Sequence, residues 1–234
     1  MDQLLRLGGF GNELAAGFLL NISVGAGALV VALTFGLGGA ALKLSPSRIL
    51  NFAGFIYTTL VRGIPELVLI IVLYFGVPRL AQTIIRPFIE GYRLDFDPVA
   101  TAVLVIGLIY GAFMTEVLRG AFLSVPKGQL EAARAFGMST RQTFWRVHMP
   151  QMWRFALPGI GNVWMVLIKA TALVSVVGLQ DILFWSGRAG QSLREPFKFY
   201  LAAAAAFLLI TFISERIIAL AEARSQRGVR KLKA

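Results

Sequence analysis

What this sequence lacks excludes several classes of chemistry. The 234 residues include no cysteine and one histidine, His148. Without cysteine there is no disulfide framework and no thiolate to bind a metal or act as a nucleophile. One histidine leaves little basis for a zinc site or a serine–histidine–aspartate set. The Gly-x-x-x-x-Gly-Lys-Ser/Thr loop that binds nucleotide phosphates is absent too, so the chain does not hydrolyse ATP by that route. We therefore predict no enzyme, no catalytic residue and no metal site.

Charged residues are also scarce. They make up 15% of the chain, whereas 57% of the residues are hydrophobic and the mean hydropathy is +0.72. In soluble domains about a quarter of the residues are charged. A chain with so few charged residues exposes a largely apolar surface, which needs a bilayer to cover it. The formal charge of +11 would suggest nucleic acid as the partner of a soluble protein. Here the basic residues lie between apolar runs, so we predict a topological charge bias and no nucleic-acid partner.

Five apolar runs are long enough to cross the roughly 30 Å of hydrocarbon, which takes about 20 helical residues. The first run is too long for a signal-peptide core, and no cleavage site frames it. We predict an all-α membrane protein in which residues 1–234 form one domain. The predicted spans cover residues 17–42, 49–78, 98–118, 155–180 and 197–220.

The loop charges predict the orientation. With the N-terminus outside, the inner segments 43–54, 119–154 and 215–234 carry 14 lysines and arginines. The outer segments 1–16, 79–98 and 181–196 carry 6. Cytoplasmic loops are enriched in these residues, so the bias favours a chain whose N-terminus is outside and whose C-terminus is inside.

The most informative segment is residues 128–150. Its pattern predicts two short helices: Gly137 suits the residue after the first, and Ser139 with Gln142 forms a capping box for the second. Pro150 is expected to end the second helix. From these residues alone, the segment is equally well a helical cytoplasmic loop made basic by topology.

The same segment resembles the coupling loop of binding-protein-dependent ABC permeases. That pattern is Glu-Ala-Ala, three residues, Gly, nine residues, then Ile-x-Leu-Pro. Apolar Val147 and Met149 stand where the family has Ile and Leu. The remaining matches are Glu131, Ala132, Ala133, Gly137 and Pro150. The resemblance implies that residues 128–150 form short cytoplasmic coupling helices that dock on an ATPase subunit.

Further matches narrow the resemblance to the polar amino-acid branch, and within it to the Q-type subunits of histidine/lysine/arginine/ornithine and octopine/nopaline importers. They lie at residues 62–66, 110–116, 119–121, 157–162 and 169–175. The likeness implies the type I importer permease fold in a bacterial inner membrane, and an importer of a polar, cationic amino acid or opine. It implies as partners an M-type sister permease, two ATPases that bind the ATP, and a periplasmic binding protein, with no cofactor on this chain. A homodimer stays open, and so does a channel or secondary-transporter subunit that uses no ATPase.

Two charged residues fall deep inside predicted spans. Glu66 and Lys169 lie at similar depths, so we hypothesise that they pair or share a polar pocket. Glu66 alternatively faces a cationic substrate. Nearer the cytoplasm, Glu116 and Arg119 suit a local ion pair.

Prolines and glycines predict helix irregularities at Pro65 and at residues 158–161. Broken helices in transporters often line the substrate path, because their freed backbone groups face the solute; a kink satisfied by neighbouring helices is the alternative. Asn162, Thr171 and Ser175 are polar groups that suit such a path, together with Glu66 and Lys169. Gly107 and Gly111 permit close contact between helices.

Overall fold

The computed structural model describes residues 9–85 and 95–226, and this part of the chain is helical, without a strand. Parts of three predicted loops, at residues 1–8, 86–94 and 227–234, lie outside the described residues. The α-helices are α2 (Gly11–Leu44), α3 (Arg48–Gly63), α4 (Glu66–Ile85), α5 (Pro98–Leu123), α6 (Lys127–Ala135), α7 (Thr140–Thr143), α8 (Met149–Ala170), α9 (Ile182–Leu193) and α10 (Pro196–Ser225).

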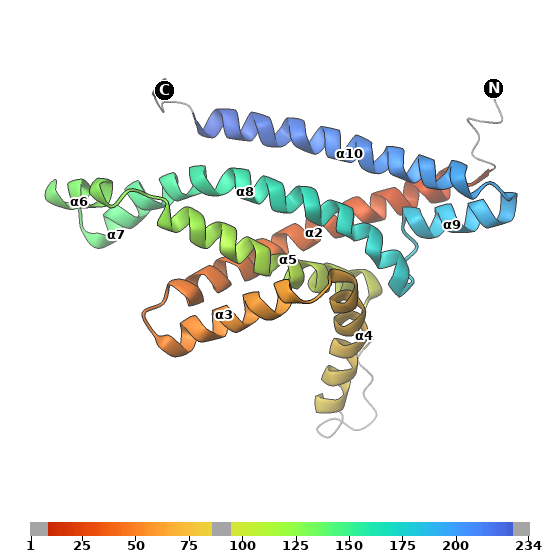
Figure 1. Ribbon diagram of the computed structural model, residues 1–234, viewed down its shortest axis with the longest axis horizontal. Coiled ribbons are helices and arrows are strands. Elements are labelled where there is room, and N and C mark those ends of the chain that lie inside the picture. The colour runs from red at the N-terminus through yellow and green to blue at the C-terminus, as the bar shows by residue number, and fades with distance from the viewer. Residues whose placement is uncertain (1–8, 86–94, 227–234) are drawn as a thin grey trace.

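Five helical segments of the described chain are long and apolar enough to cross a membrane, which confirms the predicted number. Within the second predicted span, 49–78, the chain breaks between α3 and α4, which confirms the irregularity predicted at Pro65. Ile64 is extended, with φ −107° and ψ 139°. Pro65 causes this, since its ring disfavours the helical conformation of the preceding residue and it has no N–H to donate. Figure 1 shows the consequence: α4 runs across the direction of α3.

The core forms mainly between α2 and α5, where small residues let the backbones approach. A Cβ on Gly36 would lie 2.5 Å from Cγ of Met114, and one on Gly111 would lie 2.6 Å from Cβ of Phe35. A Cβ on Gly107 would lie 2.4 Å from Cβ of Val31. These contacts confirm the close packing predicted for Gly107 and Gly111, and they are typical of membrane helices, which gain little from hydrophobic association.

The helices divide the molecule into two ends and two edges (Figure 1). α6 and α7 lie at one end, together with the last turns of α5 and α10, and α9 lies at the other. α10 forms one edge and packs on α8 and α9, whereas α3 and α4 lie at the opposite edge. The loop at 128–150 is therefore placed at the end that the charge bias assigns to the cytoplasm.

The fourth span differs from its prediction at several points. Pro158 lies inside α8 without ending it, so the helix is not broken at residues 158–161. The glycines there serve packing instead: a Cβ would lie 2.5 Å from Val117 at Gly159 and 2.7 Å from Ile218 at Gly161. Beyond Ala170 the helix tightens into a 3₁₀ turn, Thr171–Val177, which ends at Gly178 with φ +91°. The outer segment 181–196 is mostly helical, since α9 fills it.

Candidate functional site

The predicted coupling loop begins with α6, and Gly137 terminates that helix as predicted. Gly137 has φ +82°, a conformation that costs any residue with a Cβ. Its N–H donates to the carbonyl of Arg134 at 2.9 Å, and the N–H of Met138 donates to that of Ala133 at 3.2 Å. These two bonds form a Schellman motif, which satisfies carbonyls at the end of α6 and turns the chain toward α7.

The second part of the loop also starts as predicted. Ser139 and Gln142 form a capping box: the Ser139 hydroxyl accepts from the Gln142 N–H at 3.3 Å, and the Gln142 side chain accepts from the Ser139 N–H at 2.9 Å. The prediction that Pro150 ends this helix is wrong. A π-helical turn, Phe144–His148, leads from α7 directly into α8, and the Met149 N–H donates to the Phe144 carbonyl five residues back. Pro150 occupies the first turn of α8, where its missing N–H does no harm.

The loop presents exposed aromatic side chains outside the spans' apolar runs. Phe136 is 90% exposed and Trp145 is 62% exposed. Of the residues predicted to couple to an ATPase, Glu131, Ala132, Gly137 and Pro150 are exposed, Val147 and Met149 are half-buried, and Ala133 is buried. Large apolar groups exposed to water mark an interaction surface, so the loop has the character of a docking site.

His148 fastens this loop to α5. It is 8% exposed, its Nε2 lies 3.1 Å from the carbonyl oxygen of Phe122, and its ring lies 4.1 Å from the Phe122 ring. Phe144 also packs against the imidazole of His148, with ring centroids 6.0 Å apart. The coupling loop is therefore attached to the end of α5 as well as being continuous with α8, and the sequence offered only the lone histidine as a hint of this contact.

The ion cluster at the same end joins three helices. Arg119 Nε donates to Glu116 at 3.1 Å, which confirms the predicted local pair. Lys43 of α2 also binds Glu116, and its Nζ donates to Thr58 of α3 at 3.0 Å. Glu116 is 21% exposed and Lys43 14% exposed. The charges thus fix α2, α3 and α5 to one another beside the loop.

The predicted pair of Glu66 and Lys169 is not among the ion pairs of the described residues. Instead, Glu66 accepts a hydrogen bond of 2.7 Å from the hydroxyl of Tyr110, at the start of α4. The α3–α4 break determines this, because it turns Glu66 toward α5 rather than toward α8. Lys169 is exposed on α8, so the two residues have separate surroundings.

Lys169 belongs to an uncovered face of α8. Pro158, Asn162, Val166 and Lys169 are all exposed and follow one another at helical spacing. Two candidate path residues, Asn162 and Lys169, therefore share a face, whereas Ser175 is half-buried and donates to the carbonyl of Ala172 at 2.9 Å. The structure does not gather all five predicted residues into one site.

Thr171, the remaining candidate, belongs to a buried polar network that the sequence reasoning missed. Asn21 donates to the Thr171 hydroxyl at 3.2 Å and to Asp181 Oδ2 at 3.1 Å, and its own oxygen accepts from the N–H of Ile182 at 3.2 Å. Asn21 is 1% exposed, and Thr171 and Asp181 are 0% exposed. Burial raises the pKa of Asp181 above its usual value, and this effect outweighs the hydrogen bonds from Phe184 and Asn21, which lower the pKa.

This network ties the outer end of the molecule together. It connects α2 with the 3₁₀ turn and with the start of α9, where Asp181 caps the helix by accepting from the Phe184 N–H at 2.9 Å. Gly17 permits it, since a Cβ there would lie 2.6 Å from the backbone of Asp181. Helix α9 was not predicted from the sequence. Its signal was Asp181 itself, which caps the start of α9 as Asp97 caps the start of α5.

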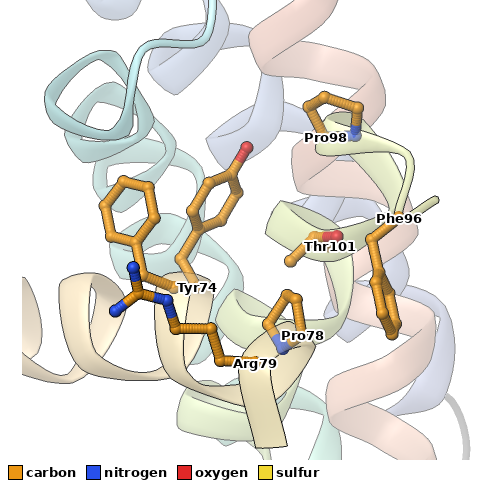
Figure 2. Close-up of a pocket in the computed structure, with 7 residues that line it drawn as sticks. Tyr74, Pro78, Arg79, Phe96, Pro98 and Thr101 are labelled. Atoms are coloured by element: carbon orange, nitrogen blue, oxygen red, sulfur yellow. The ribbon is translucent and has the colours of Figure 1, made fainter. Parts of the chain in front are cut away.

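A cavity of about 430 Å³ lies between α4 and the start of α5. Figure 2 shows Tyr74, Pro78 and Arg79 on the α4 side of this cavity, with Phe96, Pro98 and Thr101 on the other. Among the described residues that line it, Arg79 is the one charged residue, and aromatic rings supply half of the rest. An arginine beside aromatic rings is typical of a membrane–water interface, which fits the outer end predicted for this part of the chain.

Known proteins match this chain over most of its length. Residues 32–227 match the family model described as "Binding-protein-dependent transport system inner membrane component". The chain is 41% identical to the histidine/lysine/arginine/ornithine transport system permease protein HisQ of Salmonella typhimurium, over 95% of this chain and 97% of that one. It is 42% identical to the octopine transport system permease protein OccQ of Rhizobium meliloti, over 98% of both.

Solved structures share the fold. The crystal structure of an amino acid ABC transporter with histidines superposes with a TM-score of 0.81 at 24% identity, covering 94% of this chain and 98% of that one. The MetNI methionine ABC transporter, in an inward-facing form, gives 0.67 at 18% identity, covering 90% and 97%. The chain is a multi-pass membrane protein with the fold of ABC importer permeases, and it belongs to the family of binding-protein-dependent transport system inner membrane components.

Proposed function

We propose that this chain is the permease subunit of an importer that carries a cationic amino acid, or an opine derived from one, across the bacterial inner membrane. The family supports the permease role, and the names of the relatives HisQ and OccQ support the substrate class. The chain itself binds no cofactor in this proposal. ATP is bound by two partner ATPases, and a periplasmic binding protein delivers the solute.

The observation that carries the proposal is the uncovered face of α8. Lys169 and Asn162 lie on it within a segment that is apolar and long enough to span the bilayer. A lysine exposed to lipid at such a position costs several kcal/mol, about 3 on insertion scales. The face must therefore meet water or protein, and a second permease subunit that encloses a polar path with α8 provides both. An M-type sister chain fits this role, and a second copy of this chain is the other candidate.

The two charged groups suit opposite ends of a cationic amino acid, at separate points of the path because they have separate surroundings. Lys169 offers a cation for the α-carboxylate of an amino acid, and Glu66 offers a carboxylate for a cationic side chain. Glu66 is already held by Tyr110 at 2.7 Å, so its position is defined before any solute arrives. Of the other predicted path residues, Asn162 shares the exposed face of α8 with Lys169 and Ser175 is half-buried, whereas Thr171 is buried against Asn21 and does not line the path itself.

The exposed loop supplies the connection to ATP hydrolysis in this proposal. Phe136 and Trp145 project from it, and Glu131, Ala132, Ala133, Gly137, Val147, Met149 and Pro150 form its framework. Closure of the ATPase subunits then moves α8 through the continuous turn at Phe144–His148, and it moves α5 through His148.

Gly137→Arg tests the coupling role in vesicles that contain the assembled transporter. Gly137 has φ +82°, so the variant distorts the Schellman turn and should abolish transport while the complex stays in the membrane. Gly128→Ala, at a glycine of ordinary helical conformation with open space around it, is the control and should transport normally. Undiminished transport by Gly137→Arg would refute the docking role and favour a channel or secondary transporter without an ATPase.

Lys169→Met tests the path separately. We expect uptake of the cationic amino acid to fall while the binding protein still binds it with unchanged affinity. If Lys169→Met transports as the wild type does, the exposed face of α8 is not the path. A binding assay on the periplasmic protein with histidine, arginine, lysine, ornithine and opines identifies the substrate within the class.

A further inference from the structure

Two cavities follow one another between α8 and α10, and they differ in chemistry. At the end where α6 lies, a cavity of about 460 Å³ is lined by Gln129, Gln151, Arg154, Phe155 and Gln226. Farther along the same two helices, a cavity of about 370 Å³ begins at Leu157 and Ala221 and extends to Trp164 and Ile210. Apart from Ser214, whose hydroxyl accepts from Trp164 Nε1 at 2.9 Å, the second cavity is walled by apolar side chains and a glycine.

The order of these cavities matches the depth profile of a membrane leaflet. The apolar cavity lies within segments long and apolar enough to span the bilayer. The polar one lies at the last turn of α10 and the first turns of α8, on the side that the charge bias assigns to the cytoplasm (Figure 1). Arg154 is the one charged residue among the described residues that line it, and three glutamines share the lining. This set offers a positive charge and several amide N–H donors, which is what a phosphate oxygen requires.

We infer that the α8–α10 groove binds an anionic phospholipid of the cytoplasmic leaflet, with its phosphate at Arg154 and an acyl chain along Leu157, Gly161 and Ile213. Charge complementarity carries this choice of occupant, because anionic lipids concentrate in the cytoplasmic leaflet and basic residues near its surface attract them. An extended peptide would leave its backbone groups unpaired against the apolar wall, whereas an acyl chain has none; a helix of another subunit is the alternative that cross-linking tests below. Gln129 belongs to α6, so the bound headgroup touches the coupling loop itself.

Native mass spectrometry tests the site on the full chain, extracted together with the subunits that co-purify with it. The probes are phosphatidylglycerol and phosphatidylcholine with the same acyl chains, each added to delipidated protein. We expect the wild type to retain phosphatidylglycerol in preference. One basic residue near a bilayer surface contributes about fivefold in affinity, so Arg154→Gln should weaken retention about fivefold. Arg224→Gln removes the same charge from the end of α10 without lining either cavity, and it should retain the lipid.

A second variant keeps the charge and fills the apolar part. Ala221→Phe places a ring in the cavity that begins at Ala221, and it should reduce retention of both lipids. Retention unchanged in both Arg154→Gln and Ala221→Phe would overturn the inference, and so would equal loss in Arg224→Gln. Free inorganic phosphate that competes as well as the lipid would reduce the site to an ion site, which also refutes it.

Cysteine cross-linking tests whether a protein segment occupies the groove instead. The chain contains no cysteine, so Ile213→Cys introduces a single reporter in the groove. We expect this cysteine to react with a maleimide-bearing lipid and to form no cross-link to another permease subunit. A cross-link between subunits at this position would identify the groove as a subunit interface and overturn the lipid assignment.

Discussion

Replacing Asn21 by alanine removes the centre of the network at the outer end. The Asn21 side chain binds the hydroxyl and carbonyl of Thr171, the carboxylate of Asp181 and the N–H of Ile182, all between 3.1 and 3.2 Å. The alanine variant leaves Asp181 Oδ2 and the Ile182 N–H buried without these partners. Each such group costs about 1–3 kcal/mol, so we expect the free energy of unfolding to fall by about 4 kcal/mol.

Thermal unfolding in detergent measures this loss. For a chain of this size a change of 1 kcal/mol moves the melting temperature by about 2–4 °C, so Asn21→Ala should melt about 10 °C lower. Ser23→Ala is the matched control, because Ser23 lies exposed on the same helix and its hydroxyl donates to the local carbonyl of Leu20, at 2.9 Å. If Asn21→Ala melts with Ser23→Ala, within about 2 °C of the wild type, the network does not hold the outer end.

Three further changes test other contacts. Gly17→Ala should separate α9 from α2, because its Cβ would lie 2.6 Å from the Asp181 backbone, and proteolysis within α9 should accelerate. Glu116→Gln should lower the melting temperature by several degrees, whereas Glu195→Gln, in the more exposed pair with Lys198, should change it little. Burial raises the pKa of Asp181, so its stabilising contribution is complete below the ordinary aspartate pKa of about 4 and is lost as pH rises through the raised value. The melting temperature of the wild type should therefore fall, relative to Asp181→Ala, as the pH rises from the acid side; a constant difference would contradict the buried carboxylate.

Elements with a local cause were predictable from the sequence. The φ of Gly137 and the capping box at Ser139 depend on neighbouring residues alone, and both appear as predicted. The same holds for the pair of Glu116 and Arg119, which lie on one helix face. Apolar length likewise indicated the five spans, since the bilayer sets it.

Apart from the close contact at Gly107 and Gly111, features that depend on how two helices meet were not predictable. Depth alone suggested that Glu66 and Lys169 pair, but depth contains no information on the direction of α4 after the Pro65 break. Pro158 and Pro150 have the same side chain as Pro65, yet they remain in helices. Pro150 lies in the first turn of α8, directly after the π-helical turn, where its missing N–H is tolerated. Asn21 gave no signal, because its partners lie about 150 residues away in the chain.

The continuous course of α7, the π-helical turn and α8 has a mechanical consequence. From Thr140 to Ala170 the chain is helical without a linker, roughly 45 Å at 1.5 Å per residue. Because this continuous helix has no flexible linker, a movement of Trp145 at one end also tilts the 3₁₀ turn at Thr171 at the other end. Asn21 binds that turn to α2, so we expect the helix to pivot near its outer end and to move farthest at its cytoplasmic end.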